Sequence, residues 1–274
     1  MRDIIVANCL EMECKNCGTE FEGNFCNCCG QKATTRRLTY KTLAESLMHG
    51  FLHVDKGVLY TLKMLFVNPG KIVADYISCK RVSYFQPFPL LIILSTIYGL
   101  FKHLLSPEKA SHVNLASHIH ADKIYMDTLN FIINHIVENY AFVNIFIIPP
   151  FIFAVMIAFR KVGSKNYNFV EYLFGGAYLS SLYIVISIVF LCLESILKNV
   201  TFLSGWEDYE FLAYFFITMR LFYQLFEGGI WGTTKRTIYA YLLYVLFLLI
   251  YILLGVGLLV LAIMAWNGIH SLFA

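Results

Sequence analysis

The stretch IYAYLLYVLFLLIYILLGVGLLVLAIMA, from Ile238 to Ala265, decides the fold class of this chain. It holds 28 residues without a charged side chain, and Lys235 and Arg236 stand just before it. A helix of that length measures roughly 42 Å at ~1.5 Å per residue, whereas the hydrocarbon core of a bilayer is ~30 Å thick. The stretch therefore predicts a transmembrane helix that is tilted or projects beyond one face of the membrane.

The composition extends this interpretation to the whole chain. Hydrophobic residues make up 58% and charged residues only 14% of the 274 residues, whereas about a quarter of the residues are charged in a typical soluble domain. The apolar residues form long runs instead of the ~10-residue alternating segments of a membrane β-barrel. The sequence therefore predicts an all-α polytopic membrane protein.

Four further apolar runs precede the last one, and the first of them is short. Together they predict five transmembrane helices, at about 88–105, 140–159, 172–197, 209–226 and 238–265. Pro149 and Pro150 lie midway in the second span and are expected to kink it, because proline removes a backbone donor and clashes with the preceding turn.

Five of the eight cysteines crowd into sixteen residues near the N-terminus. Cys14 and Cys17 form one C-x-x-C pair, Cys26 and Cys29 form a second, and eight residues separate the pairs. Each pair points two thiolates at one position, and four thiolates around Zn²⁺ make a closed structural site. We therefore predict a zinc ribbon with these four ligands and with Cys28 as the spare thiol; the alternative is a cluster of free thiols. So small a module should be unfolded without its metal.

Three regions follow from these patterns. Residues 1–37 are predicted to be the zinc ribbon and its linker, residues 38–86 amphipathic helices, and residues 87–274 the transmembrane bundle. The apolar segments within 38–86 are too short to span, and lysines accompany them, so they are expected to lie on the membrane surface. The alternative is a small soluble helical domain packed on the membrane part.

The basic residues predict the orientation. Sixteen Lys and Arg fall on the side of the predicted spans that holds the N-terminus, against four on the other side. Because loops rich in Lys and Arg stay in the cytoplasm, the N-terminus is expected inside and the C-terminus outside.

Arg220 is the sharpest feature within the predicted spans. It lies six residues before the end of the fourth span, and a charge held inside the bilayer costs ~2.5 to 3.5 kcal/mol. We expect it to face the bundle and to pair with a carboxylate, either Glu171 or Glu227, which lie at a matching depth, or Glu194. The alternatives are snorkelling to lipid phosphates and a role in a pore or substrate site.

An ordered series of short motifs leads from the ribbon to the first span. It comprises F-C-x-x-C-G-Q-K from Phe25, D-K-G from Asp55, N-P-G-K from Asn68 and K-R-x-x-Y-F-x-P-F from Lys80. The series resembles the shared block of a domain-of-unknown-function family of bacterial membrane proteins. The resemblance implies a zinc ribbon ahead of several spans and a location in the bacterial inner membrane.

Two later positions also look similar to this family, namely Glu171 at the start of the third span and Arg220 in the fourth. The chain departs from the family pattern at Tyr172, where histidine is frequent, and between Glu227 and Gly232. These departures argue against an imidazole-based role at that point. The family is uncharacterised, so the resemblance supports the architecture and leaves the activity open.

Function is less well defined by the sequence. No motif of the common enzyme classes occurs, so an enzyme is not expected, and a net charge of +3 does not favour nucleic-acid binding. We interpret the chain as a homo-oligomer in the lipid bilayer, whose ribbon docks a cytoplasmic protein and whose bundle acts as a pore or accessory scaffold. The alternatives are a small-solute or ion transporter using the kinked second span and Arg220, and an intramembrane lipid-modifying enzyme using Glu171 and Arg220.

Overall fold

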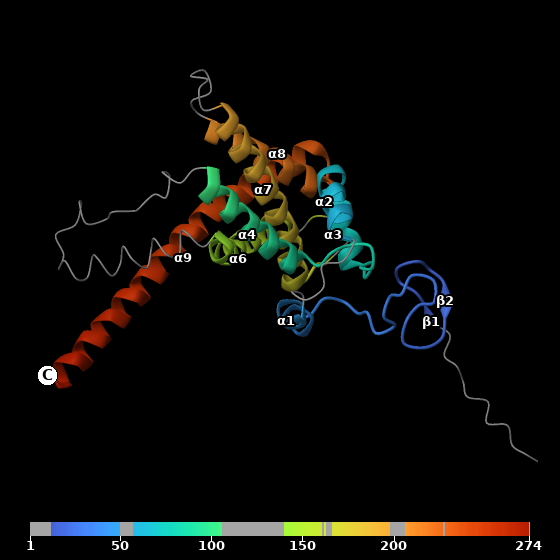
Figure 1. Cartoon of the computed structure of the whole chain (residues 1–274), viewed down its shortest axis with the longest axis horizontal. Helices are drawn as coiled ribbons and strands as arrows, with labels where there is room; N and C mark the ends of the chain where they lie inside the picture. Colours follow the sequence, from blue (N-terminus) through green and yellow to red (C-terminus); the bar gives the residue numbers. More distant parts are fainter. Residues whose placement is uncertain are drawn as a thin grey trace, which may run out of the picture.

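A small cysteine-rich lobe joined to a larger bundle of helices makes up the fold (Figure 1). The computed structural model describes residues 12–49, 57–105, 140–160, 162, 166–197, 206–226 and 228–273. Apart from one two-stranded sheet, the regular elements in these ranges are helices. The predicted all-α class is therefore confirmed.

The N-terminal lobe, residues 12–36, is built on two short hairpins. Strand β1 (Met12–Glu13) pairs antiparallel with β2 (Glu20–Phe21), with Met12 opposite Phe21. A single bridge between Phe25 and Lys32 closes the second hairpin. Helix α1 (Tyr40–His49) follows the lobe after a short linker.

Two short helices, α2 (Gly57–Val67) and α3 (Pro69–Ile77), stand between the lobe and the long helices. Pro69 occupies the first turn of α3, where its missing N–H is not needed. On the inner face of α2, the buried Thr61 hydroxyl accepts a hydrogen bond of 2.8 Å from the Phe85 N–H. This bond fixes α2 against the segment that leads into α4.

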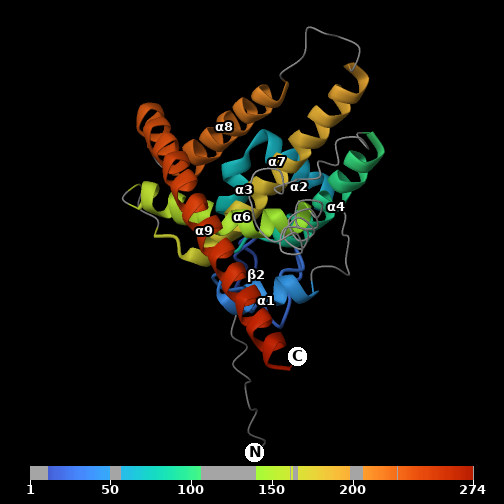
Figure 2. The same ribbon diagram turned by 90° about the vertical axis from the view of Figure 1, so that its left-hand side faces the viewer.

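Five longer helices form the bundle. They are α4 (Pro87–Leu105), α6 (Tyr140–Phe159), α7 (Phe169–Leu197), α8 (Trp206–Leu225) and α9 (Ile230–Phe273). Helix α4 packs along α7, α6 packs against α7 and α9, and α3 packs on α8 (Figure 2). Pro149 and Pro150 lie inside α6, which continues through them as a helix.

One continuous hydrophobic core joins the short helices to the bundle. Leu65 of α2, Ile72 of α3 and Phe174 of α7 are buried in the same cluster. Aromatic rings connect its parts, with centroids 5.1 Å apart for Phe88 and Phe174 and 5.5 Å apart for Tyr76 and Tyr178. The short helices therefore pack as part of the bundle, while the division of the chain at residues 37 and 86 stays a prediction.

Three helices of the described residues are long and apolar enough to cross a membrane, namely Pro87–Leu105, Phe169–Ile196 and Ile230–Leu258. They overlap the predicted first, third and fifth spans, and they indicate a membrane protein. The apolar part of α6 among the described side chains is shorter, Ile147–Phe159, and α8 is not among the candidates. The count of five spans and the orientation therefore stay predictions.

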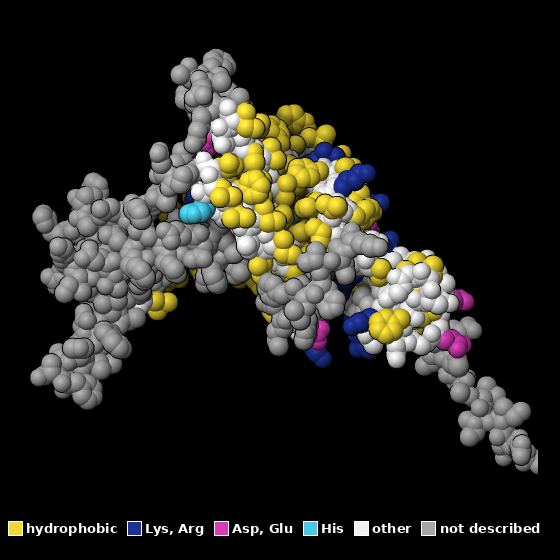
Figure 3. All heavy atoms as spheres, viewed as in Figure 1, with side chains coloured by type: hydrophobic (Ala, Val, Ile, Leu, Met, Phe, Trp, Pro, Cys, Tyr) yellow, Lys and Arg dark blue, Asp and Glu magenta, His cyan; other side chains and the backbone are white. Residues whose placement is uncertain are grey.

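Helix α9 extends well beyond the rest of the bundle toward the C-terminus (Figure 1, Figure 2). Its 44 residues correspond to roughly 66 Å at ~1.5 Å per residue. The first three turns are partly buried, with Thr233 and Ala240 buried, whereas large apolar side chains from Leu242 to Leu258 are exposed. This part of α9 presents the apolar surface that a bilayer would cover, as does the face of the bundle in Figure 3.

Candidate metal centre and its connection to the bundle

The first cysteine pair lies on a tight turn. The Gly18 N–H donates a hydrogen bond of 2.8 Å to the Cys14 carbonyl, and the Cys14 N–H donates one of 3.0 Å to the Thr19 carbonyl. Gly18 has a φ of 75°, in the left-handed region that favours glycine. The turn therefore bends the chain so that both thiols of the pair point to the same side.

The second pair repeats the same turn. The Gly30 N–H donates to the Cys26 carbonyl at 2.8 Å, and the Cys26 N–H donates to the Gln31 carbonyl at 2.8 Å. Gly30 has a φ of 76°, matching its counterpart in the first turn. Two equivalent turns therefore face each other with two thiols apiece.

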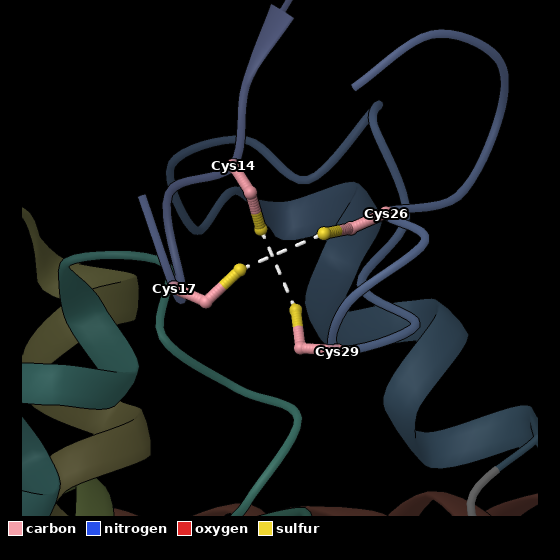
Figure 4. A group of neighbouring side chains, drawn as sticks. All are labelled: Cys14, Cys17, Cys26 and Cys29. Atoms are coloured by element: carbon pink, nitrogen blue, oxygen red, sulfur yellow. Dashed lines mark hydrogen bonds between the residues drawn. The ribbon is translucent and has the colours of Figure 1, made fainter. Parts of the chain in front are cut away.

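The four predicted thiols converge on one point (Figure 4). The Sγ atoms of Cys14, Cys17, Cys26 and Cys29 all lie within 4.8 Å of one another. Cys14 and Cys29 are 3.5 Å apart and Cys17 and Cys26 3.6 Å apart. Tetrahedral Zn²⁺ with Zn–S bonds of ~2.3 Å places sulfurs ~3.8 Å apart. The arrangement therefore fits a closed four-thiolate metal site, and Cys28, which is exposed, is outside it.

The environments of the four thiols differ. Hydrogen bonds with the side chain and backbone of Thr19 lower the pKa of Cys17 to about 6, because they stabilise its thiolate. Burial raises the pKa of Cys29 to about 12. A bound cation stabilises every ligating thiolate, so proton release accompanies metal binding and metal affinity falls as the pH falls.

The linker after the lobe is fastened to the start of α7 by an ion pair. Arg37 donates from Nε to Glu171 Oε1 at 2.6 Å and from Nη2 to Glu171 Oε2 at 2.8 Å. Its Nη2 also donates to the Asn166 carbonyl at 2.7 Å. The Glu171 side chain is 1% exposed and that of Arg37 59% exposed. The hydrogen bonds and charge of Glu171 raise the pKa of Arg37, so its guanidinium stays charged.

Glu171 also caps helix α7. The Asn168 side chain accepts a hydrogen bond of 2.8 Å from the Glu171 N–H, while Glu171 Oε2 accepts one of 2.7 Å from the Asn168 N–H. This reciprocal arrangement is a capping box, with asparagine in place of serine or threonine. Asn168 further donates to the Leu38 carbonyl at 3.1 Å. The same carboxylate therefore stabilises the helix start and holds the linker.

Arg81 provides a second connection between the lobe and the helices. Its N–H donates to the Gln31 side chain at 3.3 Å and its Nη2 to the Arg36 carbonyl at 2.9 Å. Its Nε donates to the Tyr76 carbonyl at 3.1 Å, and the guanidinium lies 5.2 Å from the centre of the Tyr76 ring. The lobe is thus held at two points, one on α7 and one just after α3.

Arg220 lies elsewhere than we expected. It is exposed and donates from Nη2 to the Val67 carbonyl at the end of α2, at 2.6 Å. The expectation that it faces the bundle and pairs with Glu171 is wrong, because Arg37 occupies that carboxylate. Glu227 lies outside the described residues, so a pairing of Arg220 with Glu227 stays a prediction.

Close packing fixes the junction of α2, α3 and α8 where Arg220 lies. Gln224, one turn after Arg220, accepts a hydrogen bond of 2.9 Å from the Gly70 N–H. A Cβ at Gly70 would lie 2.4 Å from the Gln224 Cβ and 2.8 Å from the Leu221 carbonyl oxygen. Only a glycine lets α3 approach α8 this closely.

Sequence reasoning missed Arg37, which we had assigned to a polar linker. The pattern Asn168-x-x-Glu171 before an apolar run is the signal that predicts a capped helix start there. No comparable pattern identifies the arginine that binds the capping carboxylate.

Comparison with known protein families gave one match. A family model described as a protein of unknown function (DUF3667) matches residues 55–99. The matched segment contains the D-K-G, P-G-K and K-R-x-x-Y-F-x-P-F motifs and ends before the bundle's other helices, and it does not reach the four cysteines. Comparison with curated proteins and with solved structures gave no match. The similarity supports an uncharacterised domain family and gives no information on the activity.

Proposed function

We propose that the protein is an accessory or regulatory membrane protein, in which a cytoplasmic zinc ribbon docks a protein partner and passes that event to the bundle. The observation that supports this most is the two-pronged ion pair between Arg37 and Glu171, across 134 positions of sequence. It ties the linker behind the ribbon directly to the capping group of a candidate membrane span.

The chemistry of the ribbon supports a docking role. Four thiolates would hold Zn²⁺ as a structural cross-link between the two turns, with no open position for a substrate. Near the four thiols, the side chain of Phe25 is 56% exposed. The lobe itself projects from one side of the bundle (Figure 1). An exposed aromatic side chain on a rigid turn is suited to protein contact.

The coupling step follows from the geometry of Glu171. If the ribbon moves with its partner, Arg37 leaves a carboxylate that is almost completely buried, and breaking a buried pair from one side is strongly unfavourable. The first turn of α7 must then rearrange with it. The position of Arg220 on the exposed side of α8 gives less support to a transporter that uses the kinked second span and Arg220, or to an enzyme that uses Glu171 and Arg220.

An oligomeric pore is the second candidate, and α9 favours it. Large apolar side chains between Leu242 and Leu258 lie exposed along this helix, on a surface that lipid or a second copy would cover. Ion flux through proteoliposomes that contain the purified chain distinguishes the pore from a scaffold without conductance.

The coupling is tested by hydrogen exchange at the first turn of α7 in the purified full chain in detergent. We expect metal removal and Arg37→Gln each to speed exchange there, because both release the linker from Glu171. Lys41→Gln, at an exposed lysine of α1, is the matched control and should leave exchange unchanged. Unchanged exchange at the first turn of α7 after metal removal would show that structural changes in the ribbon are not transmitted to the bundle.

A further inference from the structure

Arg220 lies on an apolar stripe of α8 that faces outward. Leu212, Phe216 and Tyr223 are 48%, 60% and 49% exposed, and together with Arg220 they recur at helical spacing on one face. In a chain with candidate membrane spans, such a stripe contacts lipid. A charged side chain within it must find an anion or reach the headgroups.

Helix α2 continues this surface next to Arg220. Its outer stripe carries Leu59, 79% exposed, Phe66, 43% exposed, and the exposed Lys63, whereas Thr61 and Leu65 on the opposite side are buried. A lysine among apolar side chains can lay its methylene chain along them and extend its ammonium group to the lipid headgroups. Lys and Arg side chains lie among hydrophobic ones where α2, α3 and α8 meet (Figure 3).

Three exposed cations stand on the helices that meet at this part of the surface. Arg220 is anchored to the carbonyl of Val67, Lys63 lies one helical turn before Val67, and Lys71 follows the buried Gly70 at the start of α3. Gly70 is itself in contact with α8, one turn beyond Arg220. The three cations therefore stand on segments that meet at the junction of α2, α3 and α8.

These cations have no carboxylate partner among the described residues. The ion pairs there are Arg37 with Glu171 and Lys80 with Asp75. A guanidinium has five N–H donors, and the bond to Val67 uses one of them. The remaining fork fits the oxygens of a phosphate, and nearby lysines add point charges.

We propose that Arg220, Lys63 and Lys71 form a binding site for the phosphate of an anionic lipid at the junction of α2, α3 and α8. The apolar stripes of α2 and α8 would receive the acyl chains while the three cations hold the headgroup. This site shares no residue with the Arg37–Glu171 connection, so it stands or falls independently of the proposed function.

The test uses the full chain in nanodiscs of neutral phosphatidylcholine, alone or mixed with phosphatidylglycerol. We expect the melting temperature to rise with the fraction of anionic lipid. Lys63→Gln with Lys71→Gln, which leaves the bond between Arg220 and Val67 in place, should weaken the apparent lipid affinity by about fivefold for each charge removed. Arg220→Gln, which removes one charge, should weaken the apparent lipid affinity by at least about fivefold.

Arg160→Gln is the control, because Arg160 is an exposed arginine at the end of α6. It should keep the wild-type response to anionic lipid. The proposal is overturned if the wild-type protein melts at the same temperature in both lipid mixtures, or if Arg160→Gln weakens the response as much as the double variant. It is also overturned if inorganic phosphate in neutral nanodiscs gives the full temperature rise, because the site would then take a soluble anion.

Discussion

The cysteine lobe and the helical bundle are held together by different forces. The lobe buries only Cys14, Phe21 and Cys26 in a core of its own. The bundle buries a continuous set of aliphatic and aromatic side chains, from Leu38 of the linker to Ala240 of α9. Because van der Waals packing over this large set of side chains holds helices together even in lipid, the bundle has its own driving force to assemble, whereas the lobe depends on what its thiols bind.

The contacts between the two regions are polar and few. Arg37 binds Glu171 and the Asn166 carbonyl, and Arg81 binds the Gln31 side chain and the Arg36 carbonyl. Hydrogen bonds of charged groups contribute about 1.5 to 3 kcal/mol each, much less than a hydrophobic core. The comparison therefore implies two regions that fold separately and are coupled by a weak link.

Loss of the metal should give the largest effect, and outside the lobe it should reach only the first turn of α7. Structural zinc binding is worth about 10 to 16 kcal/mol in small zinc modules, so Cys29→Ser or chelation should unfold the lobe. We expect rapid hydrogen exchange over residues 12–36 with unchanged exchange in α4 and the centre of α7. Cys28→Ser should keep one equivalent of zinc by elemental analysis. If the bundle unfolded together with the lobe, the two regions would be one cooperative unit.

A substitution at Gly70 should give the next largest effect, and in the bundle only. Gly70→Ala places a methyl group 2.8 Å from the Leu221 carbonyl oxygen, which cannot rotate away. Overpacking of this kind costs about 1 to 3 kcal/mol, so we expect a lower melting temperature in detergent with unchanged zinc content.

The control for this prediction is Gly99→Ala. Gly99 lies in α4, where an added Cβ would have nothing within 4 Å. Alanine is the better helix former by about 1 kcal/mol, so this variant should melt at the wild-type temperature or slightly above it. Equal destabilisation by both changes would contradict the close approach of α3 to α8.

Glu171→Gln probes the link between the regions. Glutamine also serves in a capping box, so the change removes the charge that binds Arg37 while the helix cap remains. Because Arg37 is partly exposed, we expect a loss of about 1 to 2 kcal/mol, less than for a fully buried pair. Glu171→Ala removes the cap as well and should destabilise further. Identical melting curves for the two variants would mean that the cap contributes nothing.

The lobe was easier to predict from the sequence than the contacts of the bundle, for a physical reason. The four clustered cysteines, from Cys14 to Cys29, lie within sixteen residues, and the turns that aim them need only local hydrogen bonds and a glycine. Long apolar runs likewise predict candidate spans from local sequence alone, without information about any other part of the chain.

The charged contacts depend on how distant segments meet. Arg220 had two acidic candidates at a matching depth, Glu171 and Glu227, yet the partner of Glu171 is Arg37, from a linker 134 positions earlier. Arg220 uses a backbone carbonyl, which every residue has, so no side-chain pattern marks Val67 as its partner. Only the packing of α3 on α8 brings that carbonyl within reach.

The smallest expected effect concerns a single buried hydroxyl in the bundle. Tyr178 lies wholly inside the core and donates a hydrogen bond of 2.7 Å to the Phe85 carbonyl, next to the start of α4. Tyr178→Phe keeps the ring and its packing against Tyr76 but leaves that carbonyl without this donor, which costs about 1 kcal/mol. We expect a small fall in melting temperature with unchanged zinc content and unchanged exchange over residues 12–36. A change in the lobe after so local a loss in the bundle would show that the two regions communicate through the core as well as through Arg37.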